Sequence, residues 1–213
     1  MTLAAIVRQS RDKLIAGDIL VSNFNNAPTA AASGGEQGTG RPATTTNGTV
    51  VRLALDLDGR VPRLVSSTVI ADGLSVHTDP AALIVGPTGL ALDHDGDLFV
   101  ADTVNSRIAV IPDAPFRRTP INAGADRATV SHDPALNGPL GLAIAPDGHL
   151  LAVNGADNNV VELSRSGTAV TVRDLDPVDP PGGWCCPPAA GRSAERLFEL
   201  WQVGCYGQVA HAK

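Results

Sequence analysis

The stretch that decides the fold is residues 86–112, GPTGLALDHDGDLFVADTVNSRIAVIP. Apolar residues alternate with other residues in three short runs within it, around Leu90, Leu98 and Ile108. A period of two is what a strand with one face on a hydrophobic core requires. Asp95-Gly96 separates the first two runs, and Asp-Gly between alternating runs is a strong signal of a hairpin turn. These residues therefore predict three antiparallel strands joined by short connections.

The same layout returns 52 positions later, where residues 138–161 align with residues 86–109 without a gap. Gly138-Pro139 falls on the Gly-Pro pair at the start of the first stretch, and Asp147-Gly148 falls on its hairpin turn. Repeats of about 40 to 50 residues with several strands each are typical of β-propeller blades. The two stretches therefore predict two neighbouring blades.

The residues G-P-x-G-L-A-x-D followed by D-G-D-L-F-V-A-D-T-x-N-x-R-I resemble the NHL repeat, a blade of bacterial six-bladed β-propellers. The resemblance is specific over residues 86–110, good over 138–161, partial over 17–53, and absent beyond about residue 180. It implies an all-β protein, a partial β-propeller of about three NHL-type blades of antiparallel strands.

The chain divides into three parts by composition. Residues 1–16 have apolar positions close to helical spacing, which predicts a short N-terminal helix. Residues 17–176 carry the blades, interrupted by a Gly-, Ala-, Thr- and Pro-rich insertion over residues 27–48 that predicts a long mobile loop. Further strands of the blades are expected near four segments: Thr49–Leu55, Thr68–Ile70, Arg127–Ser131 and Ala169–Arg173.

Residues 177–213 form an atypical tail, in which the repeat register is lost. Both tryptophans, all three cysteines and the only tyrosine lie in this tail. This abrupt change motivates the hypothesis that the tail is translated out of frame or joined to unrelated sequence, whereas a genuine extension is the alternative. The other two reading frames of the coding DNA test this: if neither restores a Gly-Leu-Ala strand, the hypothesis fails. Residues 193–202 of the tail are compatible with a short helix capped by Ser193.

Composition and charge exclude several classes of function. The net charge is −6, and the chain has two lysines, Lys13 and Lys213, so no nucleic-acid-binding surface is expected. No run of 18 apolar residues exists that could span a membrane. No signal peptide is visible at the N-terminus, and the compartment stays open because full-length relatives of this type are often exported.

Three blades make an open arc, since propellers of four to eight blades close on themselves. The end blades of an arc leave strand edges and apolar faces bare, and such surfaces recruit other chains. The arc is therefore expected to belong to a longer protein, to self-associate with other copies, or to be poorly stable.

Residues 93–97, Asp-His-Asp-Gly-Asp, resemble the start of a calcium loop, in which alternate carboxylates bind a hard cation. The glycine comes one residue early for an EF-hand, however, and the twelfth position is Val104 rather than an acidic residue. A hairpin turn is the preferred interpretation of this segment.

The repeat is also similar in overall pattern to gluconolactonase-type propellers, which bind a divalent metal through a Glu, Asn residues and an Asp. One Asn of that family stands in P-N-G-L, and here Thr88 and Leu140 take its place. Asp102 and Asn154 follow their second strands, as the family's Asp does. Carboxylates at such positions more often accept hydrogen bonds of turns.

The NHL motif supplies the remaining candidate residues, Asp102, Asn105 and Arg107. Their structural interpretation is that Asp102 and Asn105 bond backbone amides to close a loop, while Arg107 pairs with a carboxylate nearby. The five histidines show no metal-ligand spacing, and the cysteines do not form a C-x-x-C pair.

The sequence therefore predicts a non-catalytic β-propeller scaffold that binds an unknown protein or small-molecule ligand, with no catalytic residue, metal or cofactor assigned. The candidate binding residues are Asp102, Asn105, Arg107 and Asn154. Two alternatives are a metal-dependent gluconolactonase-like hydrolase and a truncated remnant without a function of its own.

Overall fold

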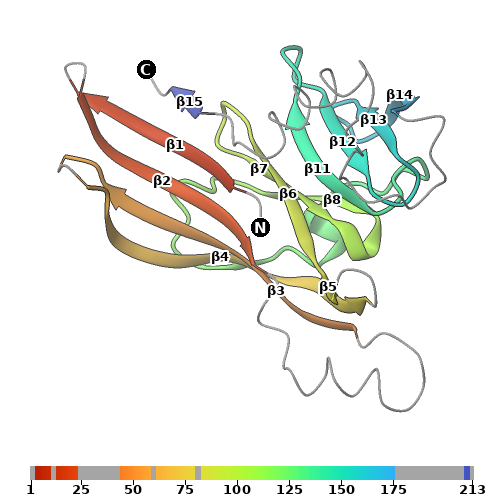
Figure 1. Ribbon diagram of the computed structural model, residues 1–213, viewed down its shortest axis with the longest axis horizontal. Helices are drawn as coiled ribbons and strands as arrows, with labels where there is room; N and C mark the ends of the chain where they lie inside the picture. The colour runs from red at the N-terminus through yellow and green to blue at the C-terminus, as the bar shows by residue number, and fades with distance from the viewer. Residues whose placement is uncertain are drawn as a thin grey trace, which may run out of the picture.

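The computed structural model describes residues 3–10, 13–23, 44–58, 61–79, 83–175 and 209–211 (Figure 1). The described chain is almost entirely β, and its strands form three sheets. No helix among these residues is long and apolar enough to cross a membrane. The predicted all-β class is confirmed, and the mainly antiparallel sheets are consistent with the predicted partial propeller, although the first sheet has seven strands and includes two parallel pairs.

The first sheet has seven strands, in the order β15-β1-β2-β3-β4-β5 with β9 beside β4. Strands β1 to β4 pair antiparallel in chain order, whereas β15 lies parallel to β1 and β9 lies parallel to β4. The strands are β1 (Leu3–Ser10), β2 (Lys13–Asn23), β3 (Thr44–Asp56), β4 (Arg63–Asp79), β5 (Leu83–Val85), β9 (Ile121–Asn122) and β15 (Val209–His211).

The second and third sheets each have four antiparallel strands in chain order and are called the second and third blades. The second blade contains β6 (Pro87–Leu92), β7 (Leu98–Asp102), β8 (Arg107–Ile111) and β10 (Thr129–Ser131). The third blade contains β11 (Pro139–Ile144), β12 (Leu150–Asn154), β13 (Asn159–Leu163) and β14 (Ala169–Asp174). Two 3-10 turns, η1 (Thr103–Asn105) and η2 (Asp126–Ala128), precede β8 and β10.

The second blade lies between the first sheet and the third blade, because the two faces of its strands are buried in two different cores. Leu90, Leu98 and Val100 pack with residues of the first sheet such as Leu20 and Val50. The opposite face belongs to the core shared with the third blade, whose buried members are Ala91, Ala101, Ile108, Leu136, Leu142, Leu150, Ala152, Val161 and Leu163. Strict alternation along β6, β7 and β8 therefore stacks the sheets face to face.

The hairpin at residues 93–96 is confirmed. Strand β6 pairs antiparallel with β7, and Gly96 has a φ of 92°, which glycine adopts readily. The Asp93 carboxylate accepts the amides of Asp95 at 3.0 Å and Asp97 at 2.8 Å, so it stabilises the turn. Asp147-Gly148 forms the equivalent turn of the third blade, where Gly148 has a φ of 85°.

The predicted N-terminal helix is wrong, because residues 3–10 form strand β1 and pair antiparallel with β2. Short apolar runs fit either period, and the neighbouring strand β2 supplies hydrogen-bond partners that an isolated helix of this length lacks. The first sheet thereby gains the first strand that the repeat pattern did not reveal.

The other predicted segments agree in part. Residues 44–48 of the predicted loop belong to β3, where Thr44 pairs with His77 and Thr45 with Val76 of the long strand β4. The rest of that loop, and the predicted helix over residues 193–202, lie outside the described residues. The strands predicted near Thr68–Ile70 and Ala169–Arg173 are found within β4 and β14, whereas the segment predicted near Arg127–Ser131 begins in η2 and is a strand only over β10.

Candidate functional site

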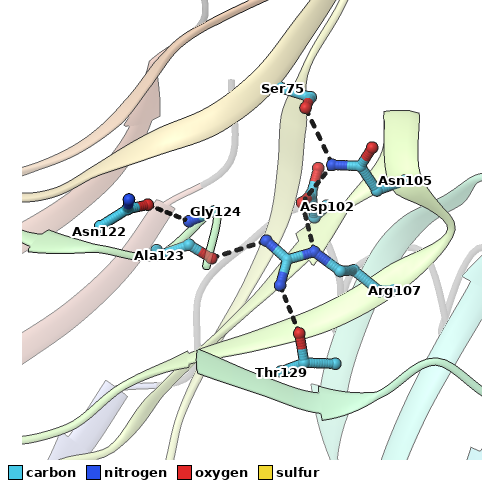
Figure 2. A network of polar contacts seen from close by, with 8 residues as sticks. All are labelled: Ser75, Asp102, Asn105, Arg107, Asn122, Ala123, Gly124 and Thr129. Carbon is cyan, nitrogen blue, oxygen red and sulfur yellow. Dashed lines mark hydrogen bonds and ion pairs between the residues drawn. The ribbon is translucent and has the colours of Figure 1, made fainter. Parts of the chain in front are cut away.

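The candidate residues Asp102, Asn105 and Arg107 meet in a buried polar network between β7 and β8 (Figure 2). Asp102 ends β7, Asn105 lies in η1 and Arg107 begins β8, so one tight connection brings all three together. Asp102 is 0% exposed and Arg107 4% exposed. The Arg107 Nε donates to Asp102 Oδ2 at 2.7 Å, which is a charge-assisted hydrogen bond.

Arg107 uses its other nitrogens to hold the segment that leads to the outer strand of the blade. Its Nη1 donates to the Thr129 hydroxyl at 2.6 Å, and its Nη2 donates to the Ala123 carbonyl at 2.7 Å. The Asn122 side chain accepts the Gly124 amide at 3.0 Å and so fixes the turn that presents this carbonyl. A planar guanidinium with five donors suits such a junction better than an ammonium group.

Asn105 connects the network to the first sheet. Its side-chain amide donates to Asp102 Oδ2 and to the Ser75 hydroxyl of β4, both at 2.9 Å. The expected pairing of Arg107 with a carboxylate is confirmed. The prediction that Asp102 and Asn105 bond backbone amides is wrong, because in the described hydrogen bonds both residues bond to side chains.

Asn154 occupies the position of Asp102 in the third blade, at the end of β12, and is 1% exposed. Its amide donates to the Ala135 carbonyl at 2.8 Å and to Asp157 Oδ2 at 3.4 Å. Asn159 stands where the second blade has Arg107, so this blade holds the same corner without a cation. Asp102 Oδ1 and Asn154 Oδ1 are both buried without a hydrogen-bond partner among the described residues.

The structure therefore separates Asn154 from the other three candidates, which form one cluster in the second blade. All four side chains are committed to neighbouring segments of the fold. A role for them in ligand binding stays a prediction.

Three hydroxyl side chains join neighbouring sheets. Thr103 donates to the Pro139 carbonyl of β11 at 2.7 Å, and Thr88 lies 2.8 Å from the Thr103 hydroxyl. Ser22 of β2 donates to the Thr88 carbonyl at 3.0 Å. Thr88, which replaces an asparagine of the gluconolactonase pattern, is thus used for contacts between β2, β6 and β11.

Asp133 carries the one resolved pKa shift among the described residues. The amides of Ala169 and Ala135, each 2.9 Å away, lower the pKa of Asp133 below its ordinary value of 3.8 because they stabilise the carboxylate. Asp133 lies between β10 and β11, and Ala169 begins β14, so this carboxylate ties the connection between the blades to the outer strand of the third blade.

The sequence spacing did not predict one cluster of possible metal ligands. It consists of Asp147, His149 and Glu162, whose ligand atoms all lie within 4.8 Å of one another. Glu162 is 13 residues from His149 in the chain, but Leu151 pairs with Glu162 in the register of β12 and β13. Only the antiparallel pairing places the two side chains together. The Asp-x-His sequence at the hairpin, combined with an acidic residue on the next strand, was the available signal.

Comparisons with known proteins agree with the sequence resemblance over one blade. The NHL repeat family matches residues 85–111, which span β6, β7 and β8. No curated protein matches the chain. A solved structure, assigned as a 6-phosphogluconolactonase from Bacteroides uniformis, is 14% identical with a TM-score of 0.37, over 81% of this chain and 57% of that chain. The chain thus spans little more than half the length of that protein, and it contains an NHL repeat in its second blade.

Proposed function

We propose that this protein is a non-catalytic β-propeller scaffold that associates with other copies of itself through uncovered faces of its sheets. The observation that carries the proposal is the repeat register of the third blade. In the second blade, the face formed by Ala91, Phe99, Ala101 and Ile108 is packed against the third blade.

The third blade repeats this face 52 positions later with Ala143, Leu151, Val153 and Val160. These four residues are only half-buried, whereas the opposite face of the same strands is in the core with the second blade. This face is mainly aliphatic, with Glu162 where the second blade has Val110, and an aliphatic sheet face is a surface that another sheet can cover.

The first sheet offers a suitable partner surface at the other end of the arc. Val51, Leu53 and Leu55 of β3 point away from the core shared with the second blade and are half-buried, and Val69 of β4, which pairs with Val51, is 41% exposed. The third blade of one copy can therefore pack on the first sheet of the next copy, as the sheets of one chain pack on each other. Such a head-to-tail contact is heterologous.

The positions that hold the metal in gluconolactonase-type propellers do not favour the lactonase alternative here. The carboxylate at the metal-ligand position, Asp102, is buried and paired with Arg107 at 2.7 Å, and Thr88 is bonded to Thr103. A buried ion pair of this kind contributes to the framework of the blade.

Sizing chromatography with light scattering over a concentration series tests the proposal. We expect the wild type to associate with increasing concentration, and Val153→Asp and Val51→Asp each to shift the protein to monomer because a charge would be buried in the contact. Phe116→Asp is the matched control, since Phe116 is 72% exposed on a loop outside both faces. Circular dichroism melts verify that each variant is folded.

A monomeric wild type at all concentrations would contradict self-association. The catalytic question is tested on the wild type, with and without calcium or zinc, on a generic lactone. Metal-dependent hydrolysis that chelation removes would overturn the non-catalytic proposal. Loss of activity in Asp102→Ala would not be decisive, because that variant leaves Arg107 buried without its partner.

A further inference from the structure

Three side chains able to bind a metal converge at one end of the third blade, apart from the Asp102 network. The His149 Nδ1 lies 2.7 Å from Glu162 Oε1 and 3.6 Å from Asp147 Oδ2. Since a carboxylate only accepts, the His149 Nδ1–H donates to Glu162. One imidazole nitrogen and two carboxylate oxygens therefore point toward a common place.

Rigid elements hold these ligands. Asp147 uses its Oδ1 to accept the His149 amide at 3.0 Å, which leaves its Oδ2 directed at the imidazole. The turn is closed by hydrogen bonds between Ala145 and His149 and between Gly148 and Ala145, both 2.8 Å. Glu162 lies on β13, which is paired on both sides. Ligands on a closed hairpin and a central strand lose little freedom on binding a metal.

The spacing of the ligand atoms suits a small tetrahedral ion. In a zinc site with bonds of about 2.0–2.1 Å, neighbouring ligand atoms lie about 3.3–3.5 Å apart. The distance of 3.6 Å between His149 and Asp147 is slightly longer than this range, and the distance of 2.7 Å between His149 and Glu162 is shorter because a proton bridges the two atoms. When a metal replaces this proton, the two atoms must move apart by about 0.7 Å to reach the spacing that the same bond lengths require.

The repeat shows that this cluster is specific to the third blade. The corresponding residues of the second blade are Asp95, Asp97 and Val110. Relative to that blade, a histidine and a glutamate both appear at positions that converge on the turn aspartate that the two blades share. The side chains of His149 and Glu162 are 29% and 30% exposed, so solvent and ions reach them.

We propose that Asp147, His149 and Glu162 form a zinc-binding site of the third blade. The donor set favours zinc over calcium and magnesium, because those ions prefer oxygen ligands alone and in larger number. Three protein ligands leave a fourth position to water. Glu162 pairs with Leu151 and therefore lies on the same sheet face as the proposed contact between copies, but the metal ligands all come from one chain, so the site does not require self-association.

A neighbouring cation, Arg165, is expected to weaken zinc binding at this site. The Arg165 guanidinium lies against Gly148, and it forms no ion pair with either carboxylate in the described part of the chain. Its positive charge repels a bound metal ion, while the carboxylate oxygens stay available as metal ligands. Arg165→Gln is therefore expected to tighten zinc binding.

Calorimetric titration of the full chain with zinc chloride tests the site. Because thiols also bind zinc, the background variant has Cys185, Cys186 and Cys205 replaced by serine. We expect one site per chain. His149→Asn and Glu162→Gln should each weaken zinc binding. Loss of a residue that only positions a ligand weakens metal binding by about 10- to 100-fold, and the loss of a ligand should exceed that. The control is His94→Asn, because His94 contacts Asp95 at 3.3 Å in the turn of the second blade without a third ligand.

The titration is run at concentrations at which light scattering finds only monomer, so that its result does not depend on association. Unchanged melting temperatures establish that the variants are folded. Absence of a zinc site in the background variant would overturn the proposal. Zinc binding of unchanged affinity in each of the two single variants, His149→Asn and Glu162→Gln, would overturn the proposal as well.

Discussion

At the scale of single residues, the second blade depends on one buried ion pair. Arg107 contacts Asp102, Thr129 and the Ala123 carbonyl, and so joins β7, β8 and the segment that leads to β10. The pattern Asp-x-x-Asn-x-Arg predicted that Arg107 would pair with a carboxylate. It could not predict Ser75, Ala123 or Thr129 as partners, because they come from segments 16 to 30 residues away along the chain that only the fold brings together.

Arg107→Ala is expected to lower the free energy of unfolding by about 3–5 kcal/mol, because it leaves the Asp102 carboxylate buried and uncompensated. Arg63→Ala is the matched control. Arg63 pairs with Asp56 at 3.1 Å, but its side chain is 79% exposed, so its loss should cost at most about 1 kcal/mol. Urea denaturation measures both values, and equal losses would show that the Arg107 pair is not structurally special.

Asp133 should give the protein a distinct acid sensitivity. Its pKa is lowered in the folded chain by the amides of Ala169 and Ala135, so the unfolded chain binds this proton more readily. The stability that Asp133 contributes is therefore present above the unfolded value of 3.8 and is lost as the pH falls through the lower folded pKa. Asp133→Asn should reduce the decline of unfolding free energy across this window, measured by urea denaturation at a series of pH values. Equal declines in variant and wild type would contradict the role.

At the scale of elements, the inner strands β6 and β11 approach so closely that one glycine is required. A Cβ on Gly89 would lie 2.7 Å from the Leu142 amide nitrogen and 2.8 Å from the Leu140 carbonyl oxygen, which are backbone atoms that cannot rotate away. Gly141, its equivalent in the third blade, would meet only side-chain atoms of Val153 at 3.5 Å. The same repeat position is therefore crowded at Gly89, where another blade covers it, and less crowded at Gly141, where no described sheet covers it.

Gly89→Ala should accordingly destabilise the protein by about 1–3 kcal/mol, the usual cost of overpacking. Gly141→Ala should change stability little, since the distances to Val153 are ordinary van der Waals contacts. Thermal melts of dilute samples compare the two variants. Equal destabilisation would mean that the surroundings of Gly141 are as crowded as those of Gly89.

The elements also show where sequence reasoning succeeded and failed. The two blades with Asp-Gly turns were predictable because each strand is followed by its partner after a short turn, as β6 is by β7. Strand β1 was not, because residues 3–10 have no such turn signature and their strand character depends on β2. The pairing of Glu162 with His149 was hidden for the same reason: it requires the register between β12 and β13.

At the scale of the whole molecule, the two ends of the described arc carry different aliphatic faces, and this difference bears on the geometry of the proposed self-association. A head-to-tail contact joins the third blade of one copy to the first sheet of another, and repeats until a ring closes or a filament grows. A two-fold contact would instead join third blade to third blade and stop at a dimer. Val153 and Val51 mark the two ends, so cysteines at these positions can distinguish the arrangements.

The final prediction concerns the cross-linking of Val153→Cys and Val51→Cys proteins in the background without native cysteines, with a short bismaleimide. We expect little cross-linking in either protein alone and a covalent dimer when the two are mixed, because only the mixture brings both positions into one head-to-tail contact. Phe116→Cys mixed with either protein is the control, since Phe116 lies on a loop outside both faces. A covalent dimer of Val153→Cys alone would point to a two-fold contact of third blades. That result would contradict the head-to-tail arrangement while preserving the uncovered blade face as the contact surface.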